Sequence, residues 1–297
     1  MIEFSYFLGI DQTGVAVCKG RKAKPLKVCL AKKEKKHWAI STRSPSQQPL
    51  TLPALTPSHL KDLLDKFEID WPNPKLAILA DSVFGMPKGV FPKVKGRNSH
   101  ENLWELFSQT LNHSLGEAIF GMKVSEIFFT RFLKSKTDIP KRDCEEVSRS
   151  NSLFTTRPFQ KNIQTGSYRI WRDLVSETTN PWINIWPFAT PEDFIMTTGW
   201  LFEGYPSLVW RDLLGLQNRN SLALIKVLKC TSMTKLFSFD SFSYLKSDPD
   251  LCDAAVLALG GVLLQDQKRL LEPFPNFWEQ PTNSTEGWIS GLTKKKD

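Results

Sequence analysis

The chain has 297 residues, of which 41% are hydrophobic and 24% are charged, a composition typical of a globular fold and not of a disordered segment. Its formal net charge is +8 and its pI is near 9.2, so a polyanionic partner such as nucleic acid is expected, although solvated surface lysines explain the charge equally well. The longest apolar run, Ala254–Leu264, is shorter than the roughly 20 residues that cross a bilayer, which argues against a membrane partner.

The cysteines and histidines follow no metal-binding or disulfide pattern. The five cysteines are widely spaced and include no CxxC pair, and the four histidines include no HxH or HxxxH pair. An odd number of isolated cysteines is typical of free thiols in a reducing compartment. We therefore expect no zinc site and a cytoplasmic location.

The first part of the chain is rich in β-prone residues. Four short runs separated by Gly or Lys-rich turns predict an antiparallel meander: Phe4–Ile10, Val15–Cys18, Leu26–Ala31 and His37–Thr42. Thr56 and Pro57 suit the cap and the first position of a helix over Ser58–Phe67. The apolar run Leu76–Leu79 then predicts a buried strand that leads to Asp81.

The composition changes after this strand. A basic loop and a long amphipathic stretch, Leu103–Leu133, predict a helical insertion over residues 88–140. Ser148–Gly166 mixes polar and aromatic residues without a period, which predicts an ordered loop. The elements expected next are a helix over Tyr168–Val175, strands over Trp182–Phe188 and Trp200–Tyr205, a helix start at Pro206 and a helix over Ser221–Leu228.

The last helix has the clearest signals. Asp248 suits the N-cap and Pro249 the first helical position, so a helix is expected from there to about Gln267, with Asp250 and Asp253 on one face of its first turns. Strands, a helix, a strand and a terminal acidic helix follow the order of a ribonuclease H-like domain. We therefore predict a single α/β domain over residues 1–297, a mixed five-stranded sheet flanked by helices, with the insertion after the fourth core strand.

Three apolar stretches each place a carboxylate at their edge: Asp11, Asp81 and Asp253. An acid beside a core costs free energy unless a cation or hydrogen-bond donors compensate it, and converging carboxylates suit Mg²⁺ or Mn²⁺. Such clusters hydrolyse phosphodiesters. Turn formation is the alternative role for Asp11 and Asp81, and interaction with the helix dipole is the alternative for Asp253.

Two further acids are secondary candidates. Glu203 follows the predicted strand and precedes a helix start, so it suits either the site or a solvent-exposed strand edge. Asp250 suits either a metal ligand or a dipole partner at the start of its helix.

Basic side chains lie on both sides of Gln164–Gly166. They can bind phosphates in a region that also carries aromatic residues, although an ordinary surface loop with salt bridges explains them as well. The predicted nucleic-acid contacts are Arg142, Arg149, Arg157, Lys161 and Arg169.

Five short motifs occur in an order that spans almost the whole chain: Gly9–Asp11, Leu79–Pro87, Gln164–Gly166, Glu203–Pro206 and Asp250–Ala254. Together they resemble the predicted nuclease family named domain of unknown function 429, which has a ribonuclease H-like fold. The resemblance implies a nuclease that depends on Mg²⁺ or Mn²⁺, with Asp11, Asp81 and Asp253 in the positions of the metal-binding carboxylates. Glu203 and Asp250 would be additional site residues.

Two other functions are compatible with the same residues. One is a non-catalytic nucleic-acid-binding or scaffold protein that keeps the fold without turnover. The other is a phosphotransferase of the actin and sugar-kinase type, because Gly9–Gly14 faintly resembles its phosphate loop. The chain lacks a clear second Asp-x-Gly motif for that reaction.

Overall fold

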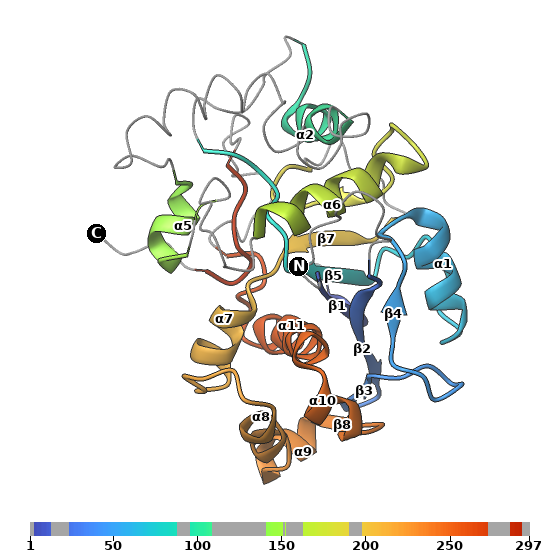
Figure 1. The fold of residues 1–297 in the computed structure, drawn as a ribbon, viewed down its shortest axis with the longest axis vertical. Coiled ribbons are helices and arrows are strands. Elements are labelled where there is room, and N and C mark those ends of the chain that lie inside the picture. The colour runs from blue at the N-terminus through green and yellow to red at the C-terminus, as the bar shows by residue number, and fades with distance from the viewer. Residues whose placement is uncertain are drawn as a thin grey trace.

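A mixed sheet lies between two layers of helices in the computed structural model of the protein (Figure 1). The structure describes residues 3–12, 24–87, 96–108, 141–150, 152, 163–189, 198–272 and 286–292. Their helices and strands are β1 (Tyr6–Asp11), β2 (Leu26–Glu34), β3 (His37–Ser41), β4 (Thr51–Leu52), α1 (Pro57–Asp65), β5 (Leu76–Ala80), α2 (Ser99–Ser108), α5 (Asp143–Ser148), α6 (Ile163–Ser176), β6 (Asn184–Ile185), β7 (Trp200–Glu203), α7 (Pro206–Leu208), the π-helical turn η1 (Val209–Leu213), α8 (Ser221–Leu228), α9 (Thr231–Leu236), β8 (Phe237–Phe239), α10 (Ser243–Ser247) and α11 (Pro249–Asp266).

The described part of the sheet has eight strands in the order β6-β7-β5-β1-β2-β3-β8, and β4 pairs with β2 off this path. β1, β2 and β3 pair antiparallel, whereas β5 is parallel to both β1 and β7. The predicted order of the meander is wrong in one respect, because β1 pairs directly with β2 and no strand lies between them in the described part of the sheet. The predicted strand Val15–Cys18 lies outside the described residues. The prediction of five strands is wrong, because β4 and β8 are only two or three residues long, too short for a periodic pattern to identify. β6 lies within the predicted strand Trp182–Phe188.

The central strands are buried on both faces. Leu8 and Ile10 of β1 belong to one hydrophobic core, which includes residues of α1, α2 and α6, and Phe7 belongs to a second core, which includes most of α11. In β5, Ile78 belongs to the first core and Leu79 to the second. This division follows from the alternation of side chains along a strand, and it explains why the central strands read as continuous apolar runs.

Two helix starts agree with the capping residues expected from the sequence. The Thr56 hydroxyl accepts a hydrogen bond from the His59 N–H at 3.3 Å, and the Asp248 carboxylate accepts one from the Leu251 N–H at 3.0 Å. The loop predicted to end at Gly166 is wrong in its last residues, because α6 already begins at Ile163. Gln164 to Gly166 therefore belong to a helix N-terminus and not to a loop.

Only part of the predicted insertion is described. Helix α2 lies within it, and residues 88–95 and 109–140 are outside the described part of the chain. None of the described helices combines the length and apolarity needed to cross a membrane. The four described cysteines, Cys29, Cys144, Cys230 and Cys252, are free thiols.

Helix α11 lies against β1 at Gly9, where the two backbones nearly touch. A Cβ atom at Gly9 would lie 2.0 Å from the Ala254 carbonyl oxygen and 2.6 Å from the Ala258 nitrogen, both in the backbone of α11. No side chain fits between strand and helix there. Asp11 and Asp253 each lie within two residues of this contact.

The substitution Gly9→Ala should lower the free energy of unfolding by about 3 kcal/mol or more, because overpacking against a backbone cannot be relieved by a rotamer change. Urea unfolding of the two proteins measures this. Gly215→Asn is the control, because Gly215 has a positive φ of 67° that Asn tolerates and a Cβ there meets nothing within 4 Å. Equal stabilities of Gly9→Ala and the wild-type protein would contradict the described packing.

Candidate carboxylate site

Three carboxylates lie at the carboxyl ends of three neighbouring parallel strands. Ile10 of β1 pairs with Ala80 of β5, and Ala80 pairs with Glu203 of β7. The Asp81 N–H donates a hydrogen bond to the Ile10 carbonyl at 2.9 Å, which continues the ladder by one residue. Asp11 and Asp81 therefore lie side by side at this edge, and Glu203 lies one residue short of them.

The two aspartates and the glutamate point to different faces of the sheet. Asp11 is two residues beyond Gly9, whose missing side chain faces α11, so the strand alternation directs Asp11 to the α11 face. Phe202 belongs to the core on the α11 side, and the same alternation directs Glu203 to the opposite face. Asp11 and Asp81 therefore lie together at this edge, and the Glu203 side chain lies on the opposite face of the sheet.

Asp253 joins the two aspartates from the first turns of α11. One of its carboxylate oxygens accepts a hydrogen bond from the Trp210 Nε1–H at 2.7 Å, and the other forms an ion pair with Arg219 at 2.8 Å. Arg219 also donates to the Ser207 hydroxyl. The third carboxylate is thus already compensated by one cation and one neutral donor.

The electrostatics of Asp81 show that these acids influence one another. Burial, together with the negative charge of Asp253, raises the pKa of Asp81 to about 7, while Arg219 and a hydrogen bond with Asp11 oppose the rise. A hydrogen bond between two carboxyl groups requires that one of them holds a proton. One carboxyl group of the pair therefore holds a proton in this arrangement, and a cation bound beside the pair would favour the loss of that proton.

Glu203 forms a separate buried cluster with Arg142. The Arg142 guanidinium donates to both oxygens of Glu203, at 2.6 and 2.7 Å, and to Glu145 at 3.0 Å. Glu203 also accepts a hydrogen bond from the Phe84 N–H at 3.0 Å. Burial raises the pKa of Glu203 above its ordinary value, and the ion pair with Arg142 opposes that rise. Glu203 is therefore engaged in structural contacts on the far face.

The C-terminal segment 286–292 completes this cluster. Arg142 donates to the Glu286 carbonyl at 3.1 Å, and the Ser290 N–H donates to the Glu203 carbonyl at 3.0 Å. Gly287 has a positive φ of 69°, and a Cβ there would lie 2.0 Å from the Phe84 carbonyl oxygen. The segment thus lies directly against the loop that follows Asp81.

The predicted nucleic-acid contacts do not form one exposed surface. Arg142 is wrong as a phosphate contact because only 1% of the residue is exposed. Arg169 is mostly buried and donates to the Pro53 carbonyl at 2.9 Å, whereas Arg149 is exposed at the end of α5. Arg157 and Lys161 lie outside the described residues, as do Thr13 and Gly14 of the predicted phosphate loop.

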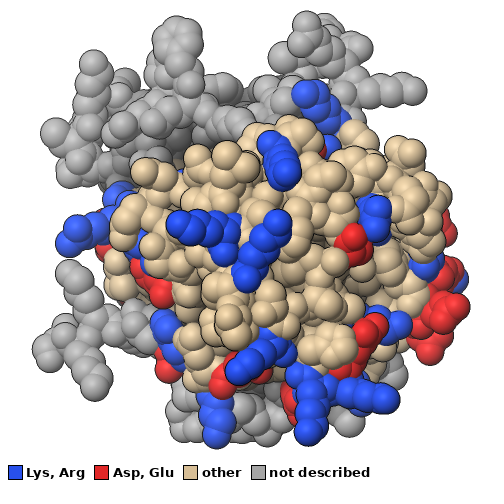
Figure 2. Space-filling model, turned by 90° about the horizontal axis from the view of Figure 1, so that it is seen from below, with Lys and Arg blue, Asp and Glu red and all other residues tan. Residues whose placement is uncertain are grey.

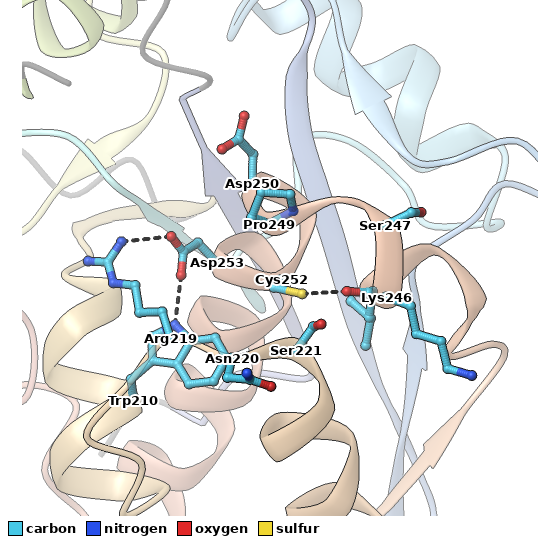
Figure 3. A pocket seen from close by; sticks show the side chains of 11 residues that line it. Trp210, Arg219, Asn220, Ser221, Lys246, Ser247, Pro249, Asp250, Cys252 and Asp253 are labelled. Carbon is cyan, nitrogen blue, oxygen red and sulfur yellow. Dashed lines mark hydrogen bonds and ion pairs between the residues drawn. The ribbon is translucent and has the colours of Figure 1, made fainter.

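Asp250 borders the site without joining the carboxylate pair. It lines the same pocket as Asp253, a cavity of about 420 Å³ between α8, α10 and α11. In Figure 3 its carboxylate points away from that of Asp253, which faces Arg219 and Trp210. Its position in the first turn of α11 fits the helix-dipole role expected as one of the two alternatives.

Two buried oxygen atoms near the strand ends, Oε1 of Gln12 and Oγ of Ser82, have no hydrogen-bond partner within the described part of the chain. Gln12 lies against Gly166 in the first turn of α6, where a Cβ would overlap its side chain. Next to Ser82, the Val83 N–H donates to the Ser167 hydroxyl at 2.9 Å. These two oxygens are therefore available to a cation or to the N–H or O–H groups of a ligand.

Sequence reasoning missed four residues of this site: Gln12, Ser82, Trp210 and Arg219. Gln12 and Ser82 directly follow the predicted acids, so their position was a usable signal. Trp210 and Arg219 approach Asp253 from 43 and 34 residues away, and no periodic pattern reports such a contact. Among the described residues, no group of three or more His, Cys, Asp or Glu side chains is arranged to hold a metal ion.

Comparisons of the chain with protein-family models, with curated proteins and with solved structures found no match. The site is therefore interpreted from its own geometry.

The substitution Arg142→Met should lower the free energy of unfolding by about 3–5 kcal/mol, because it leaves Glu203 and Glu145 buried without their counter-charge. Chemical unfolding measures the effect. Arg149→Met is the matched control, and this exposed position should change stability by less than about 0.5 kcal/mol. Adding Glu203→Gln to Arg142→Met should restore part of the loss. Equal effects at the two arginines would refute the buried cluster.

Proposed function

We propose that the protein is a divalent-metal-dependent nuclease with a ribonuclease H-like fold. The observation that carries this proposal is the pairing of Asp11 and Asp81 at the carboxyl ends of two adjacent parallel strands, with Asp253 on the same face. The strand order β3-β2-β1-β5-β7, with β2 antiparallel and α11 against β1, supports the fold assignment. The resemblance to the predicted nuclease family points to the same residues.

The donor set fits Mg²⁺ or Mn²⁺. Asp11 and Asp81 would hold the cation, with the oxygens of Gln12 and Ser82 nearby at the strand ends. Asp253 lies beside this pair, and its two oxygens are held by Trp210 and Arg219. The proposed ligands are all oxygen donors, which hard cations prefer. A cation bound there would activate water and stabilise the leaving oxygen of a phosphodiester.

The chain's own residues prepare this site in two ways. Gly9 lets α11 approach β1, which brings Asp253 to the aspartate pair. Trp210 and Arg219 hold the Asp253 side chain through both of its oxygens, so its orientation is fixed before a ligand binds. Glu203, one of the predicted catalytic residues, orders the loop after Asp81 through the Phe84 N–H and takes no part in this proposed ligand set.

A non-catalytic nucleic-acid-binding protein is the second candidate. It is favoured by the neutralisation of two of the five predicted carboxylates, Asp253 by Arg219 and Glu203 by Arg142. In that case the acids would contribute to the fold without turnover, and nucleic-acid binding would persist when they are replaced.

Purified protein with labelled single-stranded and duplex DNA and RNA should cleave at least one substrate with Mg²⁺ or Mn²⁺ and none with EDTA. Asp11→Asn and Asp81→Asn should each reduce the rate by about 10²-fold or more, as expected when a group that stabilises transition-state charge is lost. Asp62→Asn, at an exposed position of α1, should cleave at the wild-type rate.

A thermal readout separates metal binding from activity. Mg²⁺ or Mn²⁺ should raise the Tm of the wild-type protein and of Asp62→Asn more than that of Asp11→Asn, because a ligand stabilises only the state that binds it. Absence of cleavage with either metal, or full activity of Asp11→Asn, would contradict the nuclease proposal. The non-catalytic nucleic-acid-binding protein would then be the remaining candidate.

A further inference from the structure

We propose that Arg219, Lys226, Lys229, Lys235 and Lys246, here named the basic strip, bind the phosphate backbone of a nucleic acid and lead it to the carboxylate site. This inference rests on the proposed function and names a substrate-binding surface for it. It also replaces the predicted surface around Arg142 and Arg169, whose guanidinium groups are occupied within the protein.

The charge of this region is strongly one-sided. Between Leu214 and Ser247 the chain carries five Lys or Arg and a single Asp, a net charge of +4 against +8 for the whole chain. The single acid, Asp240, is engaged by Arg43 and by the Thr42 backbone. The five basic side chains are all exposed, so their charge is available to a partner.

The residues of the strip come from helices at one end of the molecule. Lys226 lies in α8, Lys235 in α9 and Lys246 in α10, and these helices form the lower end of the view in Figure 1. Figure 2 looks onto that end and shows Lys and Arg side chains across its middle. Lys229 lies over the Phe242 ring at 5.3 Å, which holds its ammonium group at the surface beside α10.

A pocket connects the strip with Asp253 of the carboxylate site. The cavity of about 420 Å³ is lined by Arg219 and Lys246 of the strip and by Asp253 of the site. Figure 3 shows Arg219 reaching across to Asp253, with Asn220 and Ser221 beside it. The Arg219 side chain is 46% exposed, so its ion pair leaves other N–H groups of the guanidinium facing solvent.

This arrangement fits a phosphodiester chain better than an isolated anion or a lipid surface. Several separated positive charges match the repeated charges of a backbone, and two of them, Arg219 and Lys246, line the pocket that also contains Asp253 of the proposed site. The stacked rings of Phe239 and Phe242, 5.0 Å apart, lie among the lysines, an aromatic and basic mixture typical of single-strand binding.

The test measures binding without cleavage, by fluorescence anisotropy in EDTA over a range of KCl concentrations. The probes are a labelled single-stranded oligonucleotide and the matching duplex. The strip variant is Lys226→Gln with Lys246→Gln. The control is Lys66→Gln with Lys75→Gln, two exposed lysines of which the second precedes β5 at the opposite edge of the sheet.

The wild-type protein should bind, with an affinity that falls steeply with salt. The strip variant should bind single strands of any sequence more weakly. The slope of the logarithm of the binding constant against the logarithm of the salt concentration should be smaller by about 1.4, because two phosphate contacts are lost and each contributes about 0.7. The control variant should retain the wild-type slope. A strip variant with wild-type affinity and slope would overturn the proposal even if the protein cleaves nucleic acid.

One comparison separates this proposal from the nuclease proposal, and a second measurement tests the assignment to nucleic acid. If the strip variant loses binding but the wild-type protein cleaves nothing with Mg²⁺ or Mn²⁺, the strip stands and the nuclease proposal falls. Binding to vesicles of phosphatidylserine and phosphatidylcholine, without binding to either oligonucleotide, would overturn the assignment to nucleic acid in favour of a membrane surface.

Discussion

The close contact between α11 and β1 at Gly9 is the constraint on which the site depends. Because no Cβ fits between the Gly9 backbone and that of Ala254, the helix lies directly on the central strand. Asp253 precedes Ala254 and Asp11 follows Gly9 by two residues, so the same contact that closes the core brings two carboxylates to one edge. Parallel pairing of β1 with β5 adds Asp81.

The protein compensates these acids in three different ways. Asp253 forms an ion pair with Arg219 and accepts a hydrogen bond from the Trp210 indole N–H. On the opposite face of the sheet, Glu203 forms a bidentate ion pair with Arg142. Asp11 and Asp81 share a hydrogen bond, and the pKa of Asp81 rises to about 7 as a result of burial and of the Asp253 charge. A cation bound beside this pair would favour the ionised form of both carboxyl groups.

Much of the fold could be predicted from the sequence, because apolar runs and capping residues are local signals. Thr56 and Asp248 cap their helices as expected, and an acid after an apolar strand placed Asp11 and Asp81 at one edge. The face of the sheet to which Glu203 points follows from the alternation of side chains along β7, so it could have been predicted too. The partners of Asp253 and Glu203 could not, because Arg219 and Arg142 lie 34 and 61 residues away along the chain.

The most direct measurement of the central claim is the pKa of Asp81, followed by NMR of aspartate-labelled protein and assigned through Asp81→Asn. If Asp11, Asp81 and Asp253 form one cluster, Asp81 should titrate at about 7 in the wild type. In Asp253→Asn its pKa should fall, because a negative charge is lost while Arg219 stays nearby. A wild-type pKa near the ordinary value of 3.8, unchanged in Asp253→Asn, would show that the acids do not meet.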